Sequence, residues 1–255
     1  MADNVSFGYR QVTSAEKKRL VQEHFDPIAR TYDLADVLLS VGLDARWRKE
    51  AIGLLGLESG DRVLDACGGT GGLAKLAAER VRPGGKVLIY DFNLPMMEAG
   101  RATLGRGETR SLISFVQGDA EDLSFPDATF DAVTMGFGIR NLANPQKGLN
   151  ECLRVLAPRG QLMILEFSVP VNRLLGGLYH LYSFHWMPLV GRLICGTGAP
   201  FCYLAESVRV FPGPEEVAVT MRNAGFSDVR FRRLFNGMAV VYLGTKPEPP
   251  ANGQD

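Results

Sequence analysis

The stretch that decides the fold is RVLDACGGTGGLA, residues 62–74. It reads as a short apolar strand, a turn rich in glycine and the start of a helix. Glycine permits positive φ and lets ligand atoms approach the main chain, so this order is typical of a nucleotide-binding loop. Residues 69–74, GTGGLA, also satisfy the G-x-G-x-x-A pattern of NAD-binding proteins. The loop alone therefore leaves NAD open as a ligand.

Strand and helix patterns alternate after this stretch. We expect further buried strands at 86–92, 113–119, 130–138 and 161–168, and helices at 72–81, 95–104 and 145–156. Apolar strands separated by helices indicate a parallel sheet covered on both faces. The last two strands, 228–235 and 238–244, flank Asn236-Gly237, a strong hairpin signal. The sequence therefore predicts an α/β, Rossmann-like fold of the class I methyltransferase type, with seven mostly parallel strands and an antiparallel C-terminal hairpin.

The pattern predicts one domain over residues 13–246. Its first part, residues 13–58, reads as an N-terminal helical lid, because Thr13 and Glu16 have the spacing of a capping box and helical patterns follow. The ends of the chain are polar and rich in residues that break helices and strands. We expect two flexible tails there, at 1–12 and 247–255.

Composition argues against several classes of protein. The 255 residues carry 28 basic and 28 acidic side chains, whereas a nucleic-acid-binding protein normally has a basic excess. Four scattered cysteines are too few for a disulfide scaffold and indicate a reducing, cytoplasmic setting. We find no apolar signal segment and no window of roughly 18 uninterrupted apolar residues. No metal site is expected, since no zinc pattern matches the spacing of His180, His185, Cys195 and Cys202.

Three aspartates near the glycine loop help to distinguish its possible ligands. Asp91 closes the second strand, where a carboxylate can accept hydrogen bonds from the ribose hydroxyls of NAD or of S-adenosylmethionine (SAM). Asp119 ends the third strand, where an acid and the next backbone amide can bind adenine. Asp65 directly precedes the glycines; it would repel a pyrophosphate but suits the sulfonium and ammonium of SAM. With the terminal hairpin, these features favour SAM, although Asp65 and Asp119 could instead cap backbone amides.

Longer blocks of the sequence resemble one family. The blocks are DACGGTGG, YDFNLPMM, QGDAEDLSFPDATFDAV, FGIRN, LRVLAPRGQLMILEFS, YSFH and YLAES. They are similar to the ubiquinone/menaquinone biosynthesis C-methyltransferases of the UbiE/MenG type, over residues 25–246. The resemblance implies a class I SAM-dependent fold, methylation of a ring carbon on a polyprenylated quinol, and cofactor contacts at Thr70, Asp91, Asp119 and Ala120. The expected SAM site is completed by Asp65, Gly69, Gly71 and Gly136.

The chain departs from this family at three positions near the cofactor. Members usually carry Ala where Cys67 stands, Asp where Gly72 stands, and Ser where Gly136 stands. Gly136 has no side chain to offer, so we expect only a backbone contact with SAM there. Without an acid at position 72, Asp65 should take more of the contact with the methionine ammonium.

Methyl transfer to an aromatic carbon sets the requirements for the catalytic residues. The ring becomes nucleophilic when an adjacent phenol loses its proton, so the acceptor must be a quinol, and a base or a cation near the phenolate is needed. Arg140 and Asn141, in FGIRN, follow the fourth strand at the edge where ligands of α/β sheets bind. In proteins resembling this one the matching pair is proposed to act with water. We expect Arg140 to handle the proton and Asn141 to orient the ring; the alternative is an Arg–carboxylate pair that holds the loop.

Aromatic residues complete the expected acceptor site. Tyr32, in the helical lid, could meet the quinol oxygen with its hydroxyl and close the site against water, or only pack the helix onto the domain. Tyr182 and His185, in YSFH, are expected to contact the substrate, with helix capping as the alternative for His185.

Residues 171–202 interrupt the sheet between its fifth and sixth strands. The segment is apolar and aromatic but contains five glycines, more breakers than a core helix needs. We interpret it as an apolar, substrate-side insertion that accepts the prenyl tail and touches the membrane surface transiently, at the inner face. A homodimer interface or ordinary core are the alternatives.

Two other functions remain open from the sequence. One is a SAM-dependent methyltransferase for a different small phenolic or lipid acceptor. The other is a SAM-binding accessory subunit of a quinone-biosynthesis complex, without turnover of its own. The intact FGIRN block favours an active enzyme, whereas the glycine at position 136 keeps the accessory role open.

Overall fold

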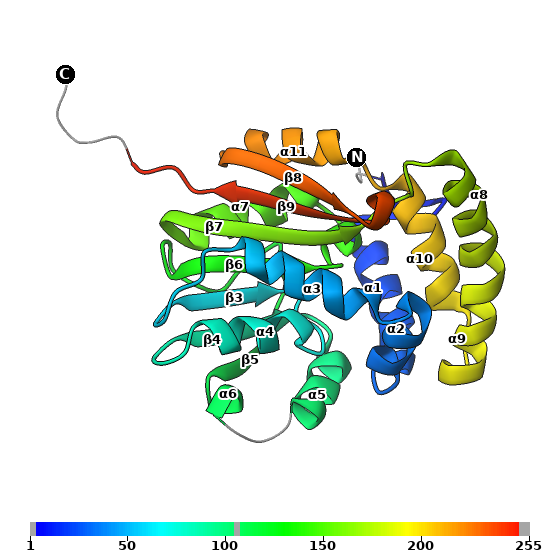
Figure 1. Cartoon of the computed structure of the whole chain (residues 1–255), viewed down its shortest axis with the longest axis horizontal. Helices are drawn as coiled ribbons and strands as arrows, with labels where there is room; N and C mark the ends of the chain where they lie inside the picture. The colour runs from blue at the N-terminus through cyan, green and yellow to red at the C-terminus, as the bar shows by residue number, and fades with distance from the viewer. Residues whose placement is uncertain (1–3, 105–107, 250–255) are drawn as a thin grey trace.

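In the computed structural model, which describes residues 4–104 and 108–249, the core is a seven-stranded sheet (Figure 1). From edge to edge its strands are β5 (Ile113–Gln117), β4 (Lys86–Asp91), β3 (Arg62–Ala66), β6 (Phe130–Gly136), β7 (Leu156–Phe167), β9 (Ala239–Thr245) and β8 (Ser227–Leu234). Strands β3 to β7 pair in parallel, and β9 pairs antiparallel with both β7 and β8. The predicted α/β fold with an antiparallel C-terminal edge is confirmed.

Helices bury both faces of this sheet. One face is covered by α3 (Leu43–Leu54), α4 (Gly72–Arg80) and α5 (Leu94–Thr103), and the other by α7 (Pro145–Val155) and α11 (Pro214–Asn223); the short α6 is Glu108–Ser111. Alanines at Ala74, Ala77 and Ala78 bring α4 close to the strands, and all three are fully buried. Both faces are apolar because helices cover a parallel sheet on each side, as the continuous apolar strands indicate.

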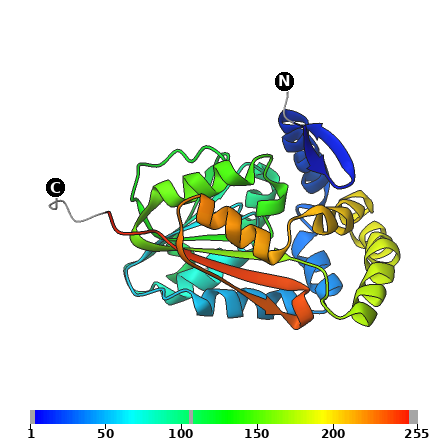
Figure 2. The same ribbon diagram turned by 90° about the horizontal axis from the view of Figure 1, so that it is seen from above.

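The N-terminal segment contradicts the prediction of a flexible tail. Within residues 4–13, β1 (Asn4–Phe7) and β2 (Arg10–Thr13) form an antiparallel pair. Phe7 of β1 and Val12 of β2 are buried. The Phe7 ring stacks on the Tyr203 ring, with 4.2 Å between the ring centroids. The pair is held by packing on a helix far along the chain, so residues 4–12 are ordered (Figure 2). At the other end, residues 250–255 of the predicted second tail lie outside the described residues.

The predicted helical lid consists of three helices. Helix α1 (Ser14–Phe25) begins at Thr13, whose side chain accepts a hydrogen bond from the Glu16 amide at 3.2 Å. A 3-10 turn (Asp26–Ile28) leads to α2 (Tyr32–Ser40). Val41 and Gly42 then take positive φ, which ends α2 and turns the chain into α3.

The apolar insertion is helical and lies at one end of the molecule (Figures 1 and 2). It comprises α8 (Arg173–Leu181), a π-helical turn (Tyr182–Trp186), α9 (Met187–Cys195) and the start of α10 (Ala199–Val210). Helix α9 packs against α2 and α10. A Cβ on Gly191 would lie 2.1 Å from the Phe201 ring, so this glycine lets α9 and α10 approach closely. Within residues 4–104 and 108–249, no helix has the length and apolar content needed to cross a bilayer.

Candidate functional site

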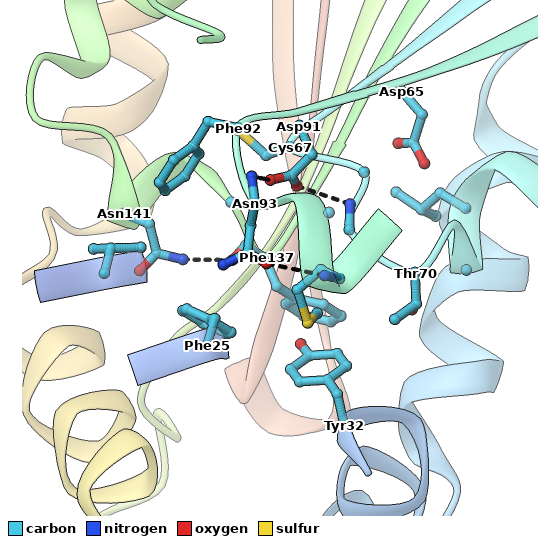
Figure 3. A pocket seen from close by; sticks show the side chains of 18 of the residues that line it. Phe25, Tyr32, Asp65, Cys67, Thr70, Asp91, Phe92, Asn93, Phe137 and Asn141 are labelled. Atoms are coloured by element: carbon cyan, nitrogen blue, oxygen red, sulfur yellow. Dashed lines mark hydrogen bonds between the residues drawn. The ribbon is translucent and has the colours of Figure 1, made fainter. Parts of the chain in front are cut away.

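The first pocket lies at the carboxyl ends of β3, β4 and β6 and has a volume of about 770 Å³ (Figure 3). Its floor is the loop after β3, where the backbone takes positive φ at Cys67, Gly69 and Gly71. A Cβ on Gly71 would lie 2.6 Å from Cδ1 of Ile89, so both conformation and space require glycine there. The loop thus has the tight turn that the sequence predicts.

Asp91 is held at the wall of this pocket by backbone amides. Its Oδ2 accepts a hydrogen bond from the Gly69 amide and its Oδ1 one from the Asn93 amide, both at 2.8 Å. Burial raises the pKa of Asp91 to about 6, against the opposing effect of these amides. A carboxylate has about four acceptor positions, so capacity remains for the hydroxyls of a ribose.

Asp65 also lines the first pocket, but its carboxylate is already bonded within the protein. Its Oδ1 accepts from the Thr134 hydroxyl at 2.7 Å, and its Oδ2 accepts from the Ala74 amide at 3.1 Å. Asp65 therefore caps a backbone amide, which is the alternative that the sequence left open, and it does so while lining the pocket. Burial raises the pKa of Asp65 to about 7, so a bound cation would favour its ionised form.

The lid helix α2 touches the glycine loop directly. The hydroxyl of Thr70 donates a hydrogen bond to Asp33 Oδ1 at 2.7 Å. Arg48 from α3, which the sequence analysis missed, lines the same pocket beside Gly72. A Cβ on Gly72 would lie 3.0 Å from Arg48 Nη1. The missing acid at position 72 would have stood next to this guanidinium.

Gly136, where a backbone contact with SAM is expected, lines the first pocket. A Cβ at this position would be 2.6 Å from Cδ1 of Leu73, which is buried. The serine that is usual in similar proteins would therefore force Leu73 to move.

A third, smaller pocket continues from the first. Asp119 and Ala120 line it, and it shares Cys67 and Asp91 with the first pocket. Lys18 from α1 lies over it, with Nζ 2.5 Å from Asp119 Oδ2. Asp119 Oδ1 also accepts a hydrogen bond from the Glu121 amide at 2.9 Å, so the amide-capping alternative is observed for this residue too.

The second pocket, of about 820 Å³, lies between the lid and the insertion. It is mostly apolar and aromatic, and it meets the first pocket at Phe25 and Tyr32, which line both. The remaining side chains around it include Ala35, Leu39, Trp47, Arg140, Phe167, Tyr179, Tyr182, Met187, Phe201, Tyr203 and Met238. In Figure 3 the hydroxyl of Tyr32 points into the first pocket. Burial raises the pKa of Tyr32 well above its usual value, so this hydroxyl keeps its proton.

Arg140 lines the second pocket and forms the Arg–carboxylate pair considered above as the alternative. Its Nη1 lies 2.6 Å from Glu166 Oε1 and also donates to the Phe137 carbonyl at 2.6 Å. Both side chains are nearly fully buried. The Nε of Arg140 has no hydrogen-bond partner among the described residues. The guanidinium is therefore anchored through Nη1, while its buried Nε is left unpaired in the described part of the chain.

Asn141, in contrast, lines the first and third pockets. Its Oδ1 accepts from the Tyr203 hydroxyl at 3.0 Å, and its Nδ2 donates to the Phe137 carbonyl at 3.4 Å. Lys17, which the sequence analysis also missed, donates from Nζ to the carbonyls of Arg140 and Leu142. Arg140 and Asn141 thus line different pockets, and α1 holds the turn that carries both residues.

Of the two substrate-contacting residues predicted in the insertion, one lines the second pocket and the other does not. Tyr182 lines the second pocket, and its hydroxyl donates to the Leu39 carbonyl. The prediction that His185 lines the substrate pocket is wrong, because its side chain is exposed and belongs to none of the three pockets. The π-helical turn at 182–186 shifts the helical phase, so faces counted from α8 do not continue through it.

Comparison with known proteins agrees with this geometry. A model of the ubiE/COQ5 methyltransferase family matches residues 11–246. The ubiquinone/menaquinone biosynthesis C-methyltransferase UbiE of Pseudomonas putida (strain W619) is 43% identical over 241 residues, which cover 94% of each chain.

Solved structures share the fold. A SAM-dependent methyltransferase from Thermotoga maritima has a TM-score of 0.62 at 20% identity, covering 88% of this chain and 98% of that chain. Human N-acetylserotonin methyltransferase in complex with SAM has a TM-score of 0.57 at 19% identity, covering 84% of this chain and 55% of that chain. The family match spans nearly the whole domain, from the second strand of the N-terminal pair to the end of the sheet. The chain therefore belongs to the ubiE/COQ5 methyltransferase family.

Proposed function

We propose that this enzyme transfers a methyl group from SAM to a ring carbon of a polyprenylated quinol in ubiquinone or menaquinone biosynthesis. One observation carries the proposal: a pocket lined by Asp65 and Asp91 and a mostly apolar, aromatic pocket meet at Tyr32 and Phe25. SAM in the first pocket and a quinol ring in the second would have their reacting atoms at that junction.

The first pocket fits SAM chemically. Bound SAM supplies a methyl group on a sulfonium. Asp91, at the end of β4, would accept hydrogen bonds from the ribose hydroxyls. Asp65 lines the same pocket and adds a second carboxylate, whose negative charge would favour a cationic ligand. Asp119 and Ala120 lie in the adjoining third pocket, where adenine would extend. Gly69, Thr70 and Gly136 line the first pocket, where the backbone would lie close to SAM, whereas Gly71 does not line it and instead shapes the turn.

The second pocket fits a quinol ring and the start of its tail. Arg140 lines this pocket and supplies a positive charge for a phenolate oxygen. A preorganised cation beside the ring oxygen lowers the cost of forming the phenolate. Tyr32 can donate to the same oxygen, and Asn141 borders the cofactor side of the junction, where it can orient the ring.

The outside of the second pocket supports contact with a membrane. Helix α2 turns Tyr32, Asp36 and Leu39 toward the pocket and exposes its other face. We define the outer apolar face as the exposed side chains of Leu34, Val37, Leu38, Val41, Leu174, Leu175, Leu178, Leu181, Trp186, Leu189 and Leu193. Most of these come from α2, α8 and α9, which also contribute residues to the pocket lining; Val41 directly follows α2, and Trp186 lies in the π-helical turn. Large exposed apolar patches mark interaction surfaces, and this one surrounds the helices that a lipid tail would pass.

The charge of the insertion suits an anionic bilayer. Residues 171–202 contain Arg173 and Arg192 but no aspartate or glutamate. Both arginines are exposed. We therefore include transient binding to the membrane surface in the proposed function.

Turnover with defined acceptors tests the proposed chemistry. Labelled SAM would be offered with reduced demethylmenaquinol, with 2-methoxy-6-polyprenyl-1,4-benzoquinol, and with the oxidised form of each. Label should enter the lipid fraction only with a reduced ring, since an oxidised ring has no phenol to ionise. Equal labelling of oxidised and reduced rings would contradict the phenolate chemistry. Absence of labelling with every quinol would favour the accessory role.

Vesicle binding tests the membrane contact separately. Protein would be sedimented with vesicles of phosphatidylglycerol and phosphatidylethanolamine. The double variant Leu178→Glu, Leu193→Glu should stay in the supernatant, because it places two negative charges on the outer apolar face. Val219→Glu, on the exposed side of α11, is the matched control. Equal sedimentation of both variants would exclude this face as the contact.

A further inference from the structure

The second pocket contains few groups that can accept a proton near neutral pH. Its titratable lining consists of Arg140, Asp36 and four tyrosines, Tyr32, Tyr179, Tyr182 and Tyr203. Burial raises the pKa of each tyrosine, so all four stay protonated. The Glu166 carboxylate keeps the Arg140 guanidinium charged. Asp36 is the one carboxylate among the described residues that line this pocket.

Asp36 also has the geometry of a residue that reaches the acceptor. It lies four residues after Tyr32 on α2, so both side chains share one helical face. Its Oδ2 accepts from Arg48 Nη2 at 2.6 Å, whereas its Oδ1 accepts no hydrogen bond from the described residues. One oxygen is therefore fixed, and the other is free to accept.

The nearest rival, Glu166, does not have this arrangement. Its side chain is 1% exposed, and it is not part of the pocket lining. Its Oε1 accepts from Arg140 Nη1 and the Phe167 amide, and its Oε2 faces the Arg140 amide at 3.4 Å. Glu166 therefore anchors Arg140 and has no free path to a ring in the second pocket.

We propose that Asp36 is the general base that takes the proton from the quinol hydroxyl, an inference that rests on the proposed function. The O–H bond breaks, its proton moves to Oδ1 of Asp36, and the electron pair stays on the ring oxygen beside Arg140. The ring carbon then bonds to the methyl group as the carbon–sulfur bond breaks. Loss of the ring C–H proton to water restores aromaticity, and Asp36 returns its proton to the oxygen.

Several groups set the ionisation of Asp36. Arg48 and Asp44 face it from α3, and Tyr32 and Asp33 lie beside it on α2. Burial raises the pKa of Asp36, and the Arg48 charge opposes this effect. Because the base must be ionised, kcat at saturating SAM should rise with pH as Asp36 loses its proton. This acid limb should vanish when the carboxylate is removed.

The test compares three variants in the quinol assay with labelled SAM. Asp36→Asn should lower kcat by about 100-fold or more and abolish the acid limb, while calorimetric SAM affinity stays unchanged. Asp36→Glu should keep the limb, since it keeps the carboxylate. Asp44→Asn is the matched control, because Asp44 also bonds Arg48, at 3.0 Å, but does not line the pocket.

The outcomes separate this inference from the proposed function. Wild-type-like kcat and pH dependence in Asp36→Asn would overturn the role of Asp36. Equal losses in Asp36→Asn and Asp44→Asn would also overturn it, since both residues would then act only by holding Arg48. If the wild-type enzyme labels no reduced quinol, the proposed function fails instead.

Discussion

Glu166→Ala should destabilise the fold far more than its change in volume suggests. Arg140 Nη1 and Glu166 Oε1 are 2.6 Å apart, and both side chains are nearly fully buried. Alanine would leave the buried guanidinium with the Phe137 carbonyl as its remaining acceptor, while its Nε already lacks a partner. The Phe167 amide would lose its acceptor as well.

The expected size follows from the burial of the pair. Removing one partner of a buried ion pair costs about 3–5 kcal/mol. In a domain of this size, Tm shifts by about 2–4 °C per kcal/mol, so Tm should fall by about 6–20 °C. The exposed Arg19–Glu23 pair has the same 2.6 Å separation, yet Glu23→Ala should cost at most about 0.5 kcal/mol. This substitution is the matched control for distance without burial.

Thermal unfolding of a double-mutant cycle measures the coupling. Arg140→Met with Glu166→Leu replaces the pair by apolar side chains and should unfold at a higher temperature than Glu166→Ala, because no charge remains buried alone. If Glu166→Ala unfolds within 1 °C or so of the wild-type protein, the pair does not hold the turn and the reasoning fails. Strict additivity of the Arg140 and Glu166 substitutions, within about 0.5 kcal/mol, would have the same meaning.

Three further predictions concern the first pocket. Asp91→Ala should weaken calorimetric SAM binding by about tenfold or more, from loss of charged hydrogen bonds; unchanged affinity would remove Asp91 from the cofactor site. A bound cation favours the ionised forms of Asp65 and Asp91, so SAM binding should release protons at pH 6.5 and few at pH 8.5. The release is measured as the dependence of the calorimetric binding enthalpy on the buffer. Equal proton release at both pH values would contradict the raised pKa values of the two aspartates. Gly136→Ser should lower stability by about 1–3 kcal/mol in thermal unfolding, because buried Leu73 must move; an unchanged Tm would show that it moves freely.

The sheet and the ends of its strands could be predicted because their signals are local. Each strand is a short apolar run with its own breakers, and Asn236-Gly237 marks the hairpin; Asn236 indeed takes positive φ. Asp91 is identifiable for the same reason, since a polar residue at the end of a parallel strand must lie at the carboxyl edge.

The partners of the site residues could not be predicted, because they depend on packing between distant segments. Phe7 stacks on Tyr203, and Thr70 donates a hydrogen bond to Asp33, but no local sequence pattern predicts either contact. A glutamate inside the apolar strand QLMILEF is the one signal that could have identified Glu166, since a buried acid needs a cation.

Helix α2 contacts three different environments within nine residues. Asp33 accepts a hydrogen bond from the glycine loop, Tyr32 and Asp36 line the second pocket, and Val37 is exposed on the outside. Thermodynamic linkage makes any coupling through such an element reciprocal: the factor by which SAM tightens acceptor binding is also the factor by which the acceptor tightens SAM binding. An acceptor held in a bilayer would thus set how strongly the enzyme retains a water-soluble cofactor.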